Sequence, residues 1–521
     1  MHVSHLRNFG ADRRGNVVLI FAFAIFAIGM VVGAAVDLTR ASSSKTHLQD
    51  STDAAVLAAA KAYYANGSKP EAQRVAAAQS AADAYMTAMV SGRAKTLLKP
   101  TWVVTVSADG VVTLKSQGSS PAYLGGFFGI QKLNFRTEAV AKGGAPRLEV
   151  ALVLDNTGSM KGKKLQELKK AATGLVETLE AGAANSTIED PLKLGLVPFS
   201  MTVNVGSGYR GAAWIDNAGA GSIHRENYED PKKTKTRFNL FDDMKTAWTG
   251  CVERRPAKVG GAWVDYDILE KVPGAGDPDS LYVPYFAPDE PDTGGTTYNN
   301  YLDDGVGGGW SARQRNLGKY TKKPKNGMGG LSNEYTLGPN AGCDLAPIAR
   351  LSANTSGVKA TIKNMVAVGN TDVAFGLMWG WHLLSPNAPF KDGKAYGAKD
   401  LSKIVILMTD GDNANQDTDN TNDSIYSGLG YIPSGRIGIT SGNAAARVKA
   451  MDDRLAKLCA NMKAEKIEIY AMRVEVKGSG STVLENCASG PSNYFEVANA
   501  ADMDEAFDKI ATSIMELHLS K

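Results

Sequence analysis

The sequence predicts an α/β protein with a doubly wound, mostly parallel sheet and a large loop-rich insertion, preceded by one transmembrane helix and a small α+β unit. Three observations support this fold class. An uncharged run fills residues 16–36, apolar strand-like runs alternate with helical patterns from residue 147 onward, and this alternation is interrupted from about residue 204 to about 355. The 521 residues exceed one ordinary core of about 100–200 residues, so at least two folded units, or one with a large insertion, are expected.

Composition is that of a folded protein, because 43% of the residues are hydrophobic and 21% are charged, which excludes wholesale disorder. The formal net charge is only +3, and the lysines and arginines are spread along the chain without a basic run interleaved with aromatic residues. Nucleic-acid binding is therefore not predicted.

Residues Asn16 to Val36 are the candidate membrane span. These 21 residues carry no charge, and at about 1.5 Å rise per residue a helix of this length crosses the hydrocarbon core of about 30 Å. A cleaved signal peptide has a shorter apolar run, of about 7–15 residues, and a small-residue cleavage site. Here an alanine-rich helical pattern continues after Asp37 without a breaker. We therefore predict an uncleaved anchor that contacts the lipid bilayer through residues 16–36.

The charges that flank the span predict its orientation. Arg7, Arg13 and Arg14 precede it, so the positive-inside rule puts residues 1–15 in the cytoplasm and about 480 residues outside. Arg40 and Lys45 on the far side make this bias modest.

A small α+β unit is predicted for residues 37–146. Alanine-rich patterns indicate two helices, and two alternating runs around Asp109-Gly110 give a strong hairpin signal, with a third alternating run able to pair with them. The predicted elements are helices Leu38–Gly67 and Glu71–Val90, the hairpin Trp102–Ser116 and the strand Leu133–Ala141, followed by a linker at residues 142–146.

The sequence pattern changes at Arg147. Continuous apolar runs indicate strands buried on both faces, and they alternate with amphipathic helices, which implies a parallel sheet covered by helices. The predicted strands are Leu148–Leu154, Leu192–Phe199, Ile404–Met408, Ile467–Val474 and Tyr494–Val497. The predicted helices contain Leu165 to Leu179, Val358–Val366, Asp372–Leu384, Ala444–Ala464, a short turn near Val483, and Met503–Leu517.

Four cysteines, Cys251, Cys343, Cys459 and Cys487, form no C-x-x-C pair, so a zinc site is not predicted. An even count fits two disulfides or four buried thiols. The predicted external location favours disulfides, with Cys459 paired to Cys487 across one strand and Cys251 paired to Cys343 around the loop-rich region.

Oxygen-bearing side chains follow the predicted strands at the edge where ligands collect in an open parallel sheet. Three loops supply them, Asp155-Asn156-Thr157-Gly158-Ser159, Gly369-Asn370-Thr371 and Thr409-Asp410-Gly411. Each loop alone fits a turn or a helix N-cap equally well. Together they offer two carboxylates and three hydroxyls, which are hard donors suited to Mg²⁺, with Ca²⁺ or Mn²⁺ as alternatives. So few charges favour a further carboxylate from a protein partner.

These three motifs resemble the metal-ion-dependent adhesion site of von Willebrand factor type A domains, a Rossmann-like fold. The resemblance covers residues 147–521 apart from the insertion. The usual first motif is D-x-S-x-S, and this chain has Thr157 in place of the first serine, which keeps the hydroxyl. The resemblance implies that Thr157, Ser159 and Thr371 contact the metal directly, and that Asp155 and Asp410 act mainly through bound water.

A narrower resemblance covers the whole length. The start RRGNVVLIFAFAIFAIGMVVGAAVDLTRA, the stretch LVLDNTGSM and the end CASGPSNYFEVANAADMDEAF are similar to TadG-type members of the TadE/TadG pilus-assembly family. This resemblance implies a single-pass protein of the bacterial cytoplasmic membrane, with a periplasmic C-terminal domain, that assembles tight-adherence (Flp-type) pili with other pilus-assembly components. Ile20 stands where prepilin-peptidase substrates usually have glutamate, so no such processing is expected. A surface adhesin or matrix-binding receptor is the alternative function.

No enzymatic activity is predicted. Asp155-Asn156-Thr157 lacks the second aspartate of the D-x-D phosphatase pattern, and the chain has no G-x-S-x-G elbow and no P-loop glycine-lysine. His382 is interpreted as a packed structural residue.

Two further clusters leave alternatives open. The aspartates from Asp410 to Asp423 crowd one loop and are interpreted as a solvated acidic loop rather than a calcium site. The insertion mixes aromatic and acidic residues, which fits a recognition surface or a disulfide-held segment without direct function. They are Tyr285, Phe286, Tyr298 and Tyr301 with Asp289, Glu290, Asp303 and Asp304.

Overall fold

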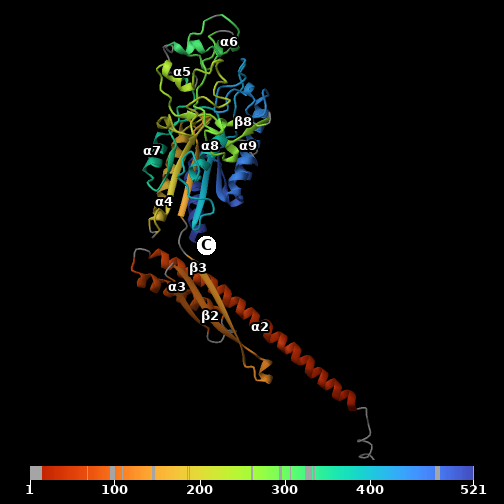
Figure 1. The fold of residues 1–521 in the computed structure, drawn as a ribbon. Coiled ribbons are helices and arrows are strands. Elements are labelled where there is room, and N and C mark those ends of the chain that lie inside the picture. The colour runs from red at the N-terminus through yellow and green to blue at the C-terminus, as the bar shows by residue number, and fades with distance from the viewer. Residues whose placement is uncertain are drawn as a thin grey trace, which may run out of the picture. The chain divides into compact units, whose positions relative to one another are not determined.

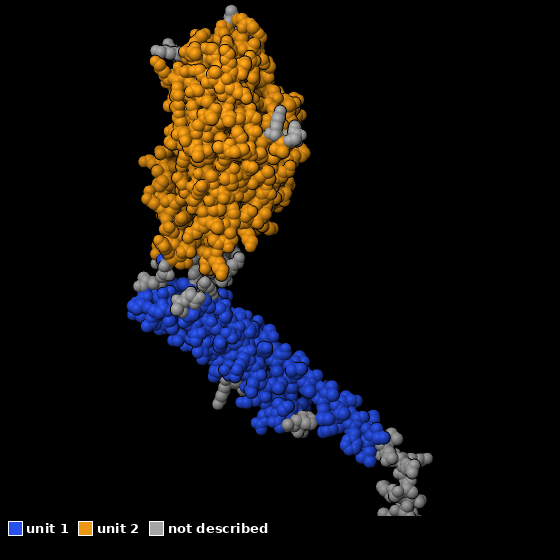
Figure 2. All heavy atoms as spheres, viewed as in Figure 1, with its two compact units in different colours: residues 1–145, 185–187, 516–521 blue, residues 146–184, 188–515 orange. Residues whose placement is uncertain are grey.

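The computed structural model forms two compact units, shown in Figure 2. Unit 1 contains residues 1–145, 185–187 and 516–521, and unit 2 contains residues 146–184 and 188–515. The residues that the structure describes are 15–66, 69–93, 100–107, 110–142, 147–184, 186, 188–259, 262–292, 296–305, 307–322, 331–332, 335–475 and 482–519.

Unit 1 is built on one long helix, α2 (Gly15–Ala65). The predicted span and the predicted helix after it are therefore continuous. The stretch that begins at Leu19 is long and apolar enough to cross a membrane, and very little of it is buried. From Asp37 onward, buried residues recur every three or four positions, as in Ala41, Ser44 and Leu48, so one stripe of the helix faces a core.

The core of unit 1 lies between this stripe, helix α3 (Glu71–Arg93) and a three-stranded antiparallel sheet. The sheet has the order β1 (Thr101–Val106), β2 (Val111–Pro121), β3 (Lys132–Lys142), and β2 and β3 run alongside α2 (Figure 1). The predicted hairpin and third strand are confirmed, although Asp109 of the predicted turn lies outside the described residues.

Unit 2 is built on the predicted doubly wound sheet. Strands β4 (Arg147–Asp155), β5 (Leu192–Phe199), β13 (Leu401–Thr409), β14 (Ile467–Val474) and β15 (Tyr494–Val497) are parallel, in the order β15-β14-β13-β4-β5. A sixth strand, β12 (Ala349–Ser352), pairs antiparallel with the outer edge of β5. The strand order reverses next to β4, the first strand, which defines the doubly wound class. The predicted fold class is confirmed.

Helices cover both faces of this sheet, as the strand β4 illustrates. Val150, Leu152 and Leu154 pack in one core cluster, whereas Ala151 and Val153 pack in another, because successive strand residues point to opposite faces. The first face carries α4 (Lys163–Ala183), α7 (Ser356–Asn364) and α11 (Met503–Leu519). The second carries α8 (Val373–Leu384), α9 (Ala444–Ala464) and α10 (Thr482–Cys487).

Helix α8 is buried along its whole length. Its two glycines permit close packing on the sheet. A Cβ atom at Gly376 would lie 2.3 Å from Cγ of Phe199, and one at Gly380 would lie 2.5 Å from Cγ2 of Val153. This approach places the N-terminus of α8, and the loop before it, at the carboxyl edge of the sheet.

The predicted insertion is folded and extends the sheet rather than only interrupting it. Its strands β6 (Val203–Asn204) and β7 (Cys251–Val252) continue the sheet beyond β5. Because β12 is a sheet strand, the insertion ends before residue 349 and not near 355. Its other elements are α5 (Arg237–Asp243), β8 (Pro256–Val259), β9 (Ala262–Asp265), α6 (Trp310–Gln314), β10 (Leu331–Ser332), β11 (Tyr335–Thr336) and several 3₁₀ turns.

Most of the aromatic and acidic residues named for the insertion lie in its interior, whereas Asp303 is exposed and Tyr298 and Asp304 are half-buried, so a recognition role of this segment stays a prediction. Tyr285, Phe286, Tyr301, Asp289 and Glu290 are all buried. The Asp289 carboxylate accepts the backbone N–H groups of Tyr301 and Leu302, both at 2.7 Å, and pairs with the Lys319 ammonium at 3.0 Å. These groups stabilise the insertion from inside.

Both predicted disulfides are present. Cys251 pairs with Cys343, closing the insertion, and Cys459 of α9 pairs with Cys487 of α10. No cysteine is free, since these two bonds use all four cysteines of the chain.

We expect non-reducing mass spectrometry of membrane-extracted protein to find both linked peptide pairs. Replacing Cys459 and Cys487 together by alanine should lower the free energy of unfolding by about 3–4 kcal/mol in the chain-entropy model, because the bond closes a loop with a sequence separation of 28. Urea unfolding of the double variant measures this loss. Free thiols at both positions in the natural protein would contradict the pairing and the oxidising compartment that it requires.

Candidate metal centre

The three predicted loops meet at the carboxyl edge of the sheet. Asp155 is the last residue of β4 and Thr409 is the last residue of β13, and these strands are neighbours in parallel register. The Gly158 N–H donates to the Gly369 carbonyl at 2.9 Å, and the Ala414 N–H donates to the Thr371 carbonyl at 2.9 Å. Backbone hydrogen bonds therefore join the first loop to the second and the second to the third.

A chain of short hydrogen bonds links three of the predicted ligands. Oγ1 of Thr157 lies 2.8 Å from Oγ of Ser159, and the Ser159 hydroxyl donates to Oδ1 of Asp410 at 2.6 Å. Thr157 and Asp410 are buried, whereas Ser159 is exposed. Three hard oxygen donors thus converge from two loops, with Ser159 toward solvent.

Asp155 lies beneath this chain and is fully buried. Its Oδ1 accepts the Thr157 N–H at 2.7 Å, which shapes the first loop, and its Oδ2 accepts the Thr409 hydroxyl at 2.6 Å. Burial, followed by the negative charge of Asp410, raises the pKa of the Asp155 carboxyl to about 6. The two carboxylates therefore repel each other, and a cation between them would relieve that repulsion.

Thr371 is placed by its backbone rather than by this chain of side chains. It is buried, and the next residue, Asp372, caps α8 by accepting the Phe375 N–H at 3.1 Å. Two side chains around the site hold this end of α8. Nη1 of Arg254 donates to both Asp372 carboxylate oxygens at 3.3 Å, and Oδ1 of Asn413 accepts the Val373 N–H at 2.9 Å. The direct metal contact of Thr371 stays a prediction.

Lys164, which the sequence analysis missed, places a positive charge against Asp410. Its ammonium donates to Oδ2 of Asp410 at 2.7 Å and lies 3.7 Å from Glu475. It sits in the first turn of α4, directly after the Asp155 loop. From sequence alone, a lysine at this position is predicted to be an ordinary surface residue. What could have indicated a role in the site is its position about one helical turn after the D-x-T-x-S motif.

The donor chemistry fits a hard divalent cation. Among the residues that the structure describes, no group of three or more histidines, cysteines, aspartates or glutamates could hold a metal ion, and the candidate centre itself offers two carboxylates with hydroxyls. Thr157, Ser159 and Asp410 would hold Mg²⁺ with the help of Asp155, and the ion would supply a Lewis-acidic point for a carboxylate. Lys164 would have to release Asp410.

The acidic loop after Asp410 is solvated at Asp412, Asp417 and Asp419, which are exposed, and it is also paired with groups of the protein. The buried Arg447 of α9 pairs with Asp417 at 2.6 Å and with Asp423 at 3.0 Å, and Asp419 accepts the Thr296 hydroxyl at 3.0 Å. Asn413, Asn415 and Asn422 of the same loop are buried. The aspartates therefore attach the loop to α9 and to the insertion.

His382 is packed, as predicted. It is buried, its Nε2 lies 2.7 Å from the Tyr282 hydroxyl, and its ring stacks edge-on against Trp379. Burial lowers the pKa of His382 well below its usual value, so the imidazole stays neutral.

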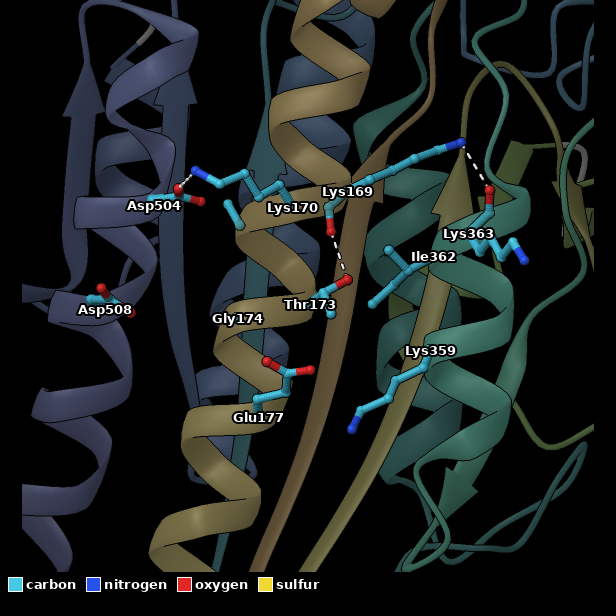
Figure 3. Close-up of a pocket in the computed structure, with 11 residues that line it drawn as sticks. Lys169, Lys170, Thr173, Gly174, Glu177, Lys359, Ile362, Lys363, Asp504 and Asp508 are labelled. Atoms are coloured by element: carbon cyan, nitrogen blue, oxygen red, sulfur yellow. Dashed lines mark hydrogen bonds and ion pairs between the residues drawn. The ribbon is translucent and has the colours of Figure 1, made fainter.

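A groove between α4, α7 and α11 is separate from the predicted ligands (Figure 3). Four lysines line it, but three of them are engaged. Lys170 pairs with Asp504, Lys359 pairs with Glu180 at 2.7 Å, and Lys169 donates to the Lys363 carbonyl at 2.9 Å. We assign no ligand to this groove.

Residues 15–62 match a family model described as putative Flp pilus-assembly TadE/G-like. This match covers most of α2 and confirms the resemblance to the TadE/TadG family at that segment. A comparison with curated protein sequences finds no match.

Solved structures that the chain is similar to include three pilus proteins. The pilus adhesin SpaC from Lactobacillus rhamnosus GG matches at 11% identity and a TM-score of 0.31, over 80% of this chain and 34% of that chain. The vWF domain of the type V pili tip protein Mfa5 from Porphyromonas gingivalis matches at 10% identity and a TM-score of 0.31, over 71% of this chain and 95% of that chain. The adhesive tip pilin GBS104 from Group B Streptococcus agalactiae matches at 8% identity and a TM-score of 0.30, over 80% of this chain and 70% of that chain. The chain thus spans about a third of SpaC.

In the absence of divalent metal, we expect the contribution of Asp155 to the free energy of unfolding to fall as the pH rises from about 4 to about 6. The pKa of Asp155 in the folded protein, about 6, lies above its usual value of 3.8. In this window the folded state retains a proton that the unfolded state has released, so folding becomes less favourable with rising pH.

Denaturant unfolding with a chelator, at several pH values, measures this dependence. Other carboxyl groups also titrate in this range, so the comparison is with Asp155→Asn, in which this contribution is removed. Identical pH slopes in the two proteins would show that Asp155 is not protonated in the folded state.

Proposed function

We propose that the protein is a single-pass component of tight-adherence (Flp-type) pilus assembly in the bacterial cytoplasmic membrane. Residues 1–15 face the cytoplasm, residues 16–36 span the bilayer and unit 2 lies in the periplasm. Unit 2 binds a carboxylate of another pilus-assembly component through Mg²⁺ held by Asp155, Thr157, Ser159, Thr371 and Asp410. Ca²⁺ and Mn²⁺ suit the same oxygen donors.

The observation that carries the binding proposal is the chain from Thr157 through Ser159 to Asp410. Its middle member, the Ser159 hydroxyl, is exposed, so a partner can reach a cation held there. The pilus role is supported by the family match of residues 15–62. The periplasmic location is supported by the two disulfides, which persist in oxidising compartments.

The proposed role is binding and not catalysis. Asp155 accepts two hydrogen bonds and Asp410 is paired with Lys164, so both carboxylates are occupied in holding the loops. The alternative is a surface adhesin or matrix-binding receptor that uses the same site. Protease treatment of intact cells separates the two, because an adhesin is cleaved from outside whereas a periplasmic domain is protected until the outer membrane is opened.

Lys164→Met is expected to tighten Mg²⁺ binding by about ten-fold or more. The metal must displace a charge-assisted hydrogen bond from Asp410, and such bonds contribute about 1.5–3 kcal/mol. Calorimetry of the full-length protein in detergent measures the affinity. Lys161→Met, at an exposed lysine of the same loop, is the control and should leave the affinity unchanged.

Asp155→Ala should abolish Mg²⁺ binding in both the natural and the Lys164→Met backgrounds, because it removes the buried charge that shapes the Thr157 loop. Unchanged affinity in Asp155→Ala would overturn the metal assignment. Equal affinities of the natural protein and Lys164→Met would show that Lys164 does not compete with the ion.

Ser159→Ala should reduce partner capture and piliation at equal protein abundance. One hydroxyl at an exposed position rarely contributes more than about 1 kcal/mol to stability, and Asp410 retains its contact with Lys164. Piliation is counted by electron microscopy, and capture is measured with and without chelator. Ser207→Ala, an exposed serine of the insertion, is the matched control. Normal pili in Ser159→Ala at matched levels would exclude this site as the working surface.

A further inference from the structure

The hairpin that connects β2 to β3 ends in a charge-free tip that packs on the apolar part of α2. We define the hairpin tip as residues 122–131, with the sequence AYLGGFFGIQ. A Cβ atom at Gly33 of α2 would lie 2.8 Å from Cδ1 of Leu124, so the two segments are in close contact there. An apolar hollow continues this contact, lined by Leu124 and Ile130 on one side and by Ile25 to Ala34 on the other.

The helix residues beside the hairpin tip belong to the segment assigned to the bilayer. Ile25 precedes the end of the span, Val36, by eleven residues, which is about 16 Å along a helix. Half of a hydrocarbon core of about 30 Å is about 15 Å. A segment in contact with Ile25 to Ala34 therefore lies within one half of the hydrocarbon core, the half that faces unit 2.

We propose that the hairpin tip is a second membrane-inserted element, seated among the acyl chains of the outer leaflet of the bilayer that α2 spans. The inference rests on the proposed function, because it takes residues 16–36 as the membrane span. The proposed partner of the hairpin tip is the lipid bilayer, although the tip is not part of the apolar run that predicts the membrane span.

The side chains of the hairpin tip suit a lipid environment. Tyr123, Leu124 and Ile130 are 60%, 42% and 50% exposed, although each is largely apolar. They form one surface with the exposed apolar residues of α2, because Leu124 and Ile130 line the same hollow as Ile25 and Phe26. A contiguous apolar surface of this kind is unfavourable in water and favourable against acyl chains.

The backbone of the hairpin tip also suits a medium without water, where an unpaired N–H group is costly. Asp37 of α2 accepts the N–H groups of Tyr123, Leu124 and Gly125 at 3.0, 2.9 and 2.8 Å. The N–H groups of Ala122, Gly129 and Ile130 donate to the carbonyls of Gln131, Gly126 and Gly125.

The polar groups around the hairpin tip are arranged as at a membrane boundary. Asp37 directly follows the predicted span and is buried by the hairpin tip, which shields its charge from the acyl chains. The Arg40 guanidinium lies 4.6 Å from the Tyr123 ring centroid. Lys132, the first residue after the tip, is exposed. Tyrosine together with lysine or arginine is the residue set that anchors proteins at the headgroup level.

The test uses the full-length protein in vesicles of phosphatidylethanolamine and phosphatidylglycerol, with one cysteine introduced for an environment-sensitive fluorophore. All four natural cysteines are in disulfides, so the new thiol is the one that reacts. Ile130→Cys and Tyr123→Cys report on the hairpin tip. Phe21→Cys, which does not line the hollow, reports on the span, and Val103→Cys, an exposed residue of β1, is the aqueous control.

We expect the labels at residues 130 and 123 to emit at shorter wavelength than the label at 103. Lipids with a spin label near the headgroup end of the acyl chain should quench most of their fluorescence, and the label at 103 should lose none. The label at 21 should be quenched by spin-labelled lipid whether or not the hairpin tip is inserted.

Three results would overturn the proposal. If the tip labels behave like the label at 103 while the label at 21 is quenched, the anchor spans the bilayer and the hairpin tip lies outside it. If the tip labels shift to shorter wavelength without quenching by lipid, a protein covers the tip. If the label at 21 is not quenched, residues 16–36 do not span the membrane as the proposed function requires, and the insertion of the hairpin tip into the bilayer is wrong as well.

Discussion

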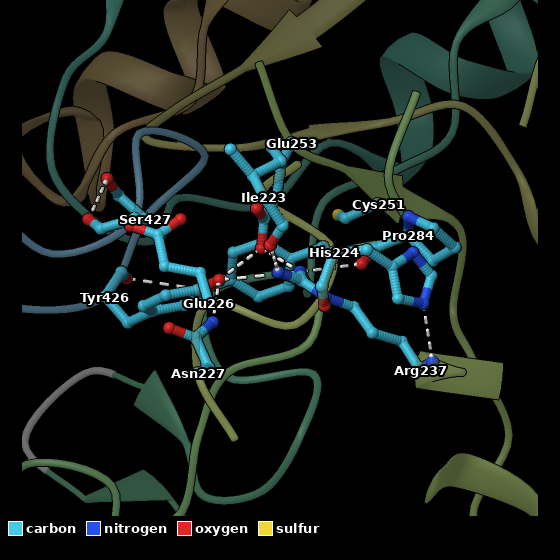
Figure 4. A network of polar contacts seen from close by, with 12 residues as sticks. Ile223, His224, Glu226, Asn227, Arg237, Cys251, Glu253, Pro284, Tyr426 and Ser427 are labelled. Atoms are coloured by element: carbon cyan, nitrogen blue, oxygen red, sulfur yellow. Dashed lines mark hydrogen bonds and ion pairs between the residues drawn. The ribbon is translucent and has the colours of Figure 1, made fainter. Parts of the chain in front are cut away.

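Buried arginine–carboxylate pairs hold the insertion of unit 2 against the carboxyl edge of the sheet, and the candidate metal centre depends on them. Arg237 of α5 forms an ion pair with Glu253. Arg436, in the loop after β13, contacts the same carboxylate at 2.9 Å. The Tyr426 hydroxyl donates a hydrogen bond to Glu253 as well, and Figure 4 shows these contacts. Arg254 pairs with Asp265 at 2.7 Å. Removing one member of such a buried pair leaves an uncompensated charge and costs about 3–5 kcal/mol. The pair of Arg436 with Glu253 joins the insertion to the loop after β13, and the pair of Arg254 with Asp372 joins it to α8.

The same pairs connect the insertion to the site. Arg254 contacts Asp265 of the insertion and Asp372, the N-cap of α8 that directly follows Thr371. Asn413 accepts the Val373 N–H and donates to Asp452 of α9, so the loop after Asp410 is attached to two helices. Because each loop is bonded to a rigid element and to its neighbour, the oxygens of the site are held in place before a ligand arrives, which lowers the entropic cost of binding.

The parts of this fold that the sequence predicts are those with local signals. Strands β5, β14 and β15 and helix α9 begin and end at the predicted residues, because apolar runs and the helical period are properties of consecutive residues. Strand β12 was missed, since ARLS is half polar and pairs with residues about 150 positions earlier. The burial of most aromatic and acidic residues of the insertion could not be predicted for a related reason. A charged residue is predicted to be exposed unless a partner for its charge is known. Partners such as Asp289 and Lys319 are distant in sequence, so local patterns do not reveal the pair.

Lys164 gives the proposed binding mechanism its electrostatic logic. Its single positive charge is paired with Asp410, and the pKa of Asp155 is raised by burial and by that neighbouring carboxylate. A divalent ion in its place brings one more positive charge than the lysine it displaces, and the displaced ammonium stays nearby on α4. The loaded site is then more positive than the empty one, and a partner's carboxylate offsets the excess. Binding linkage is reciprocal, so the partner must raise the affinity for the metal by the same factor by which the metal raises the affinity for the partner. On the proposed mechanism, a lysine within the site would make each ligand bind weakly alone and more strongly in the presence of the other.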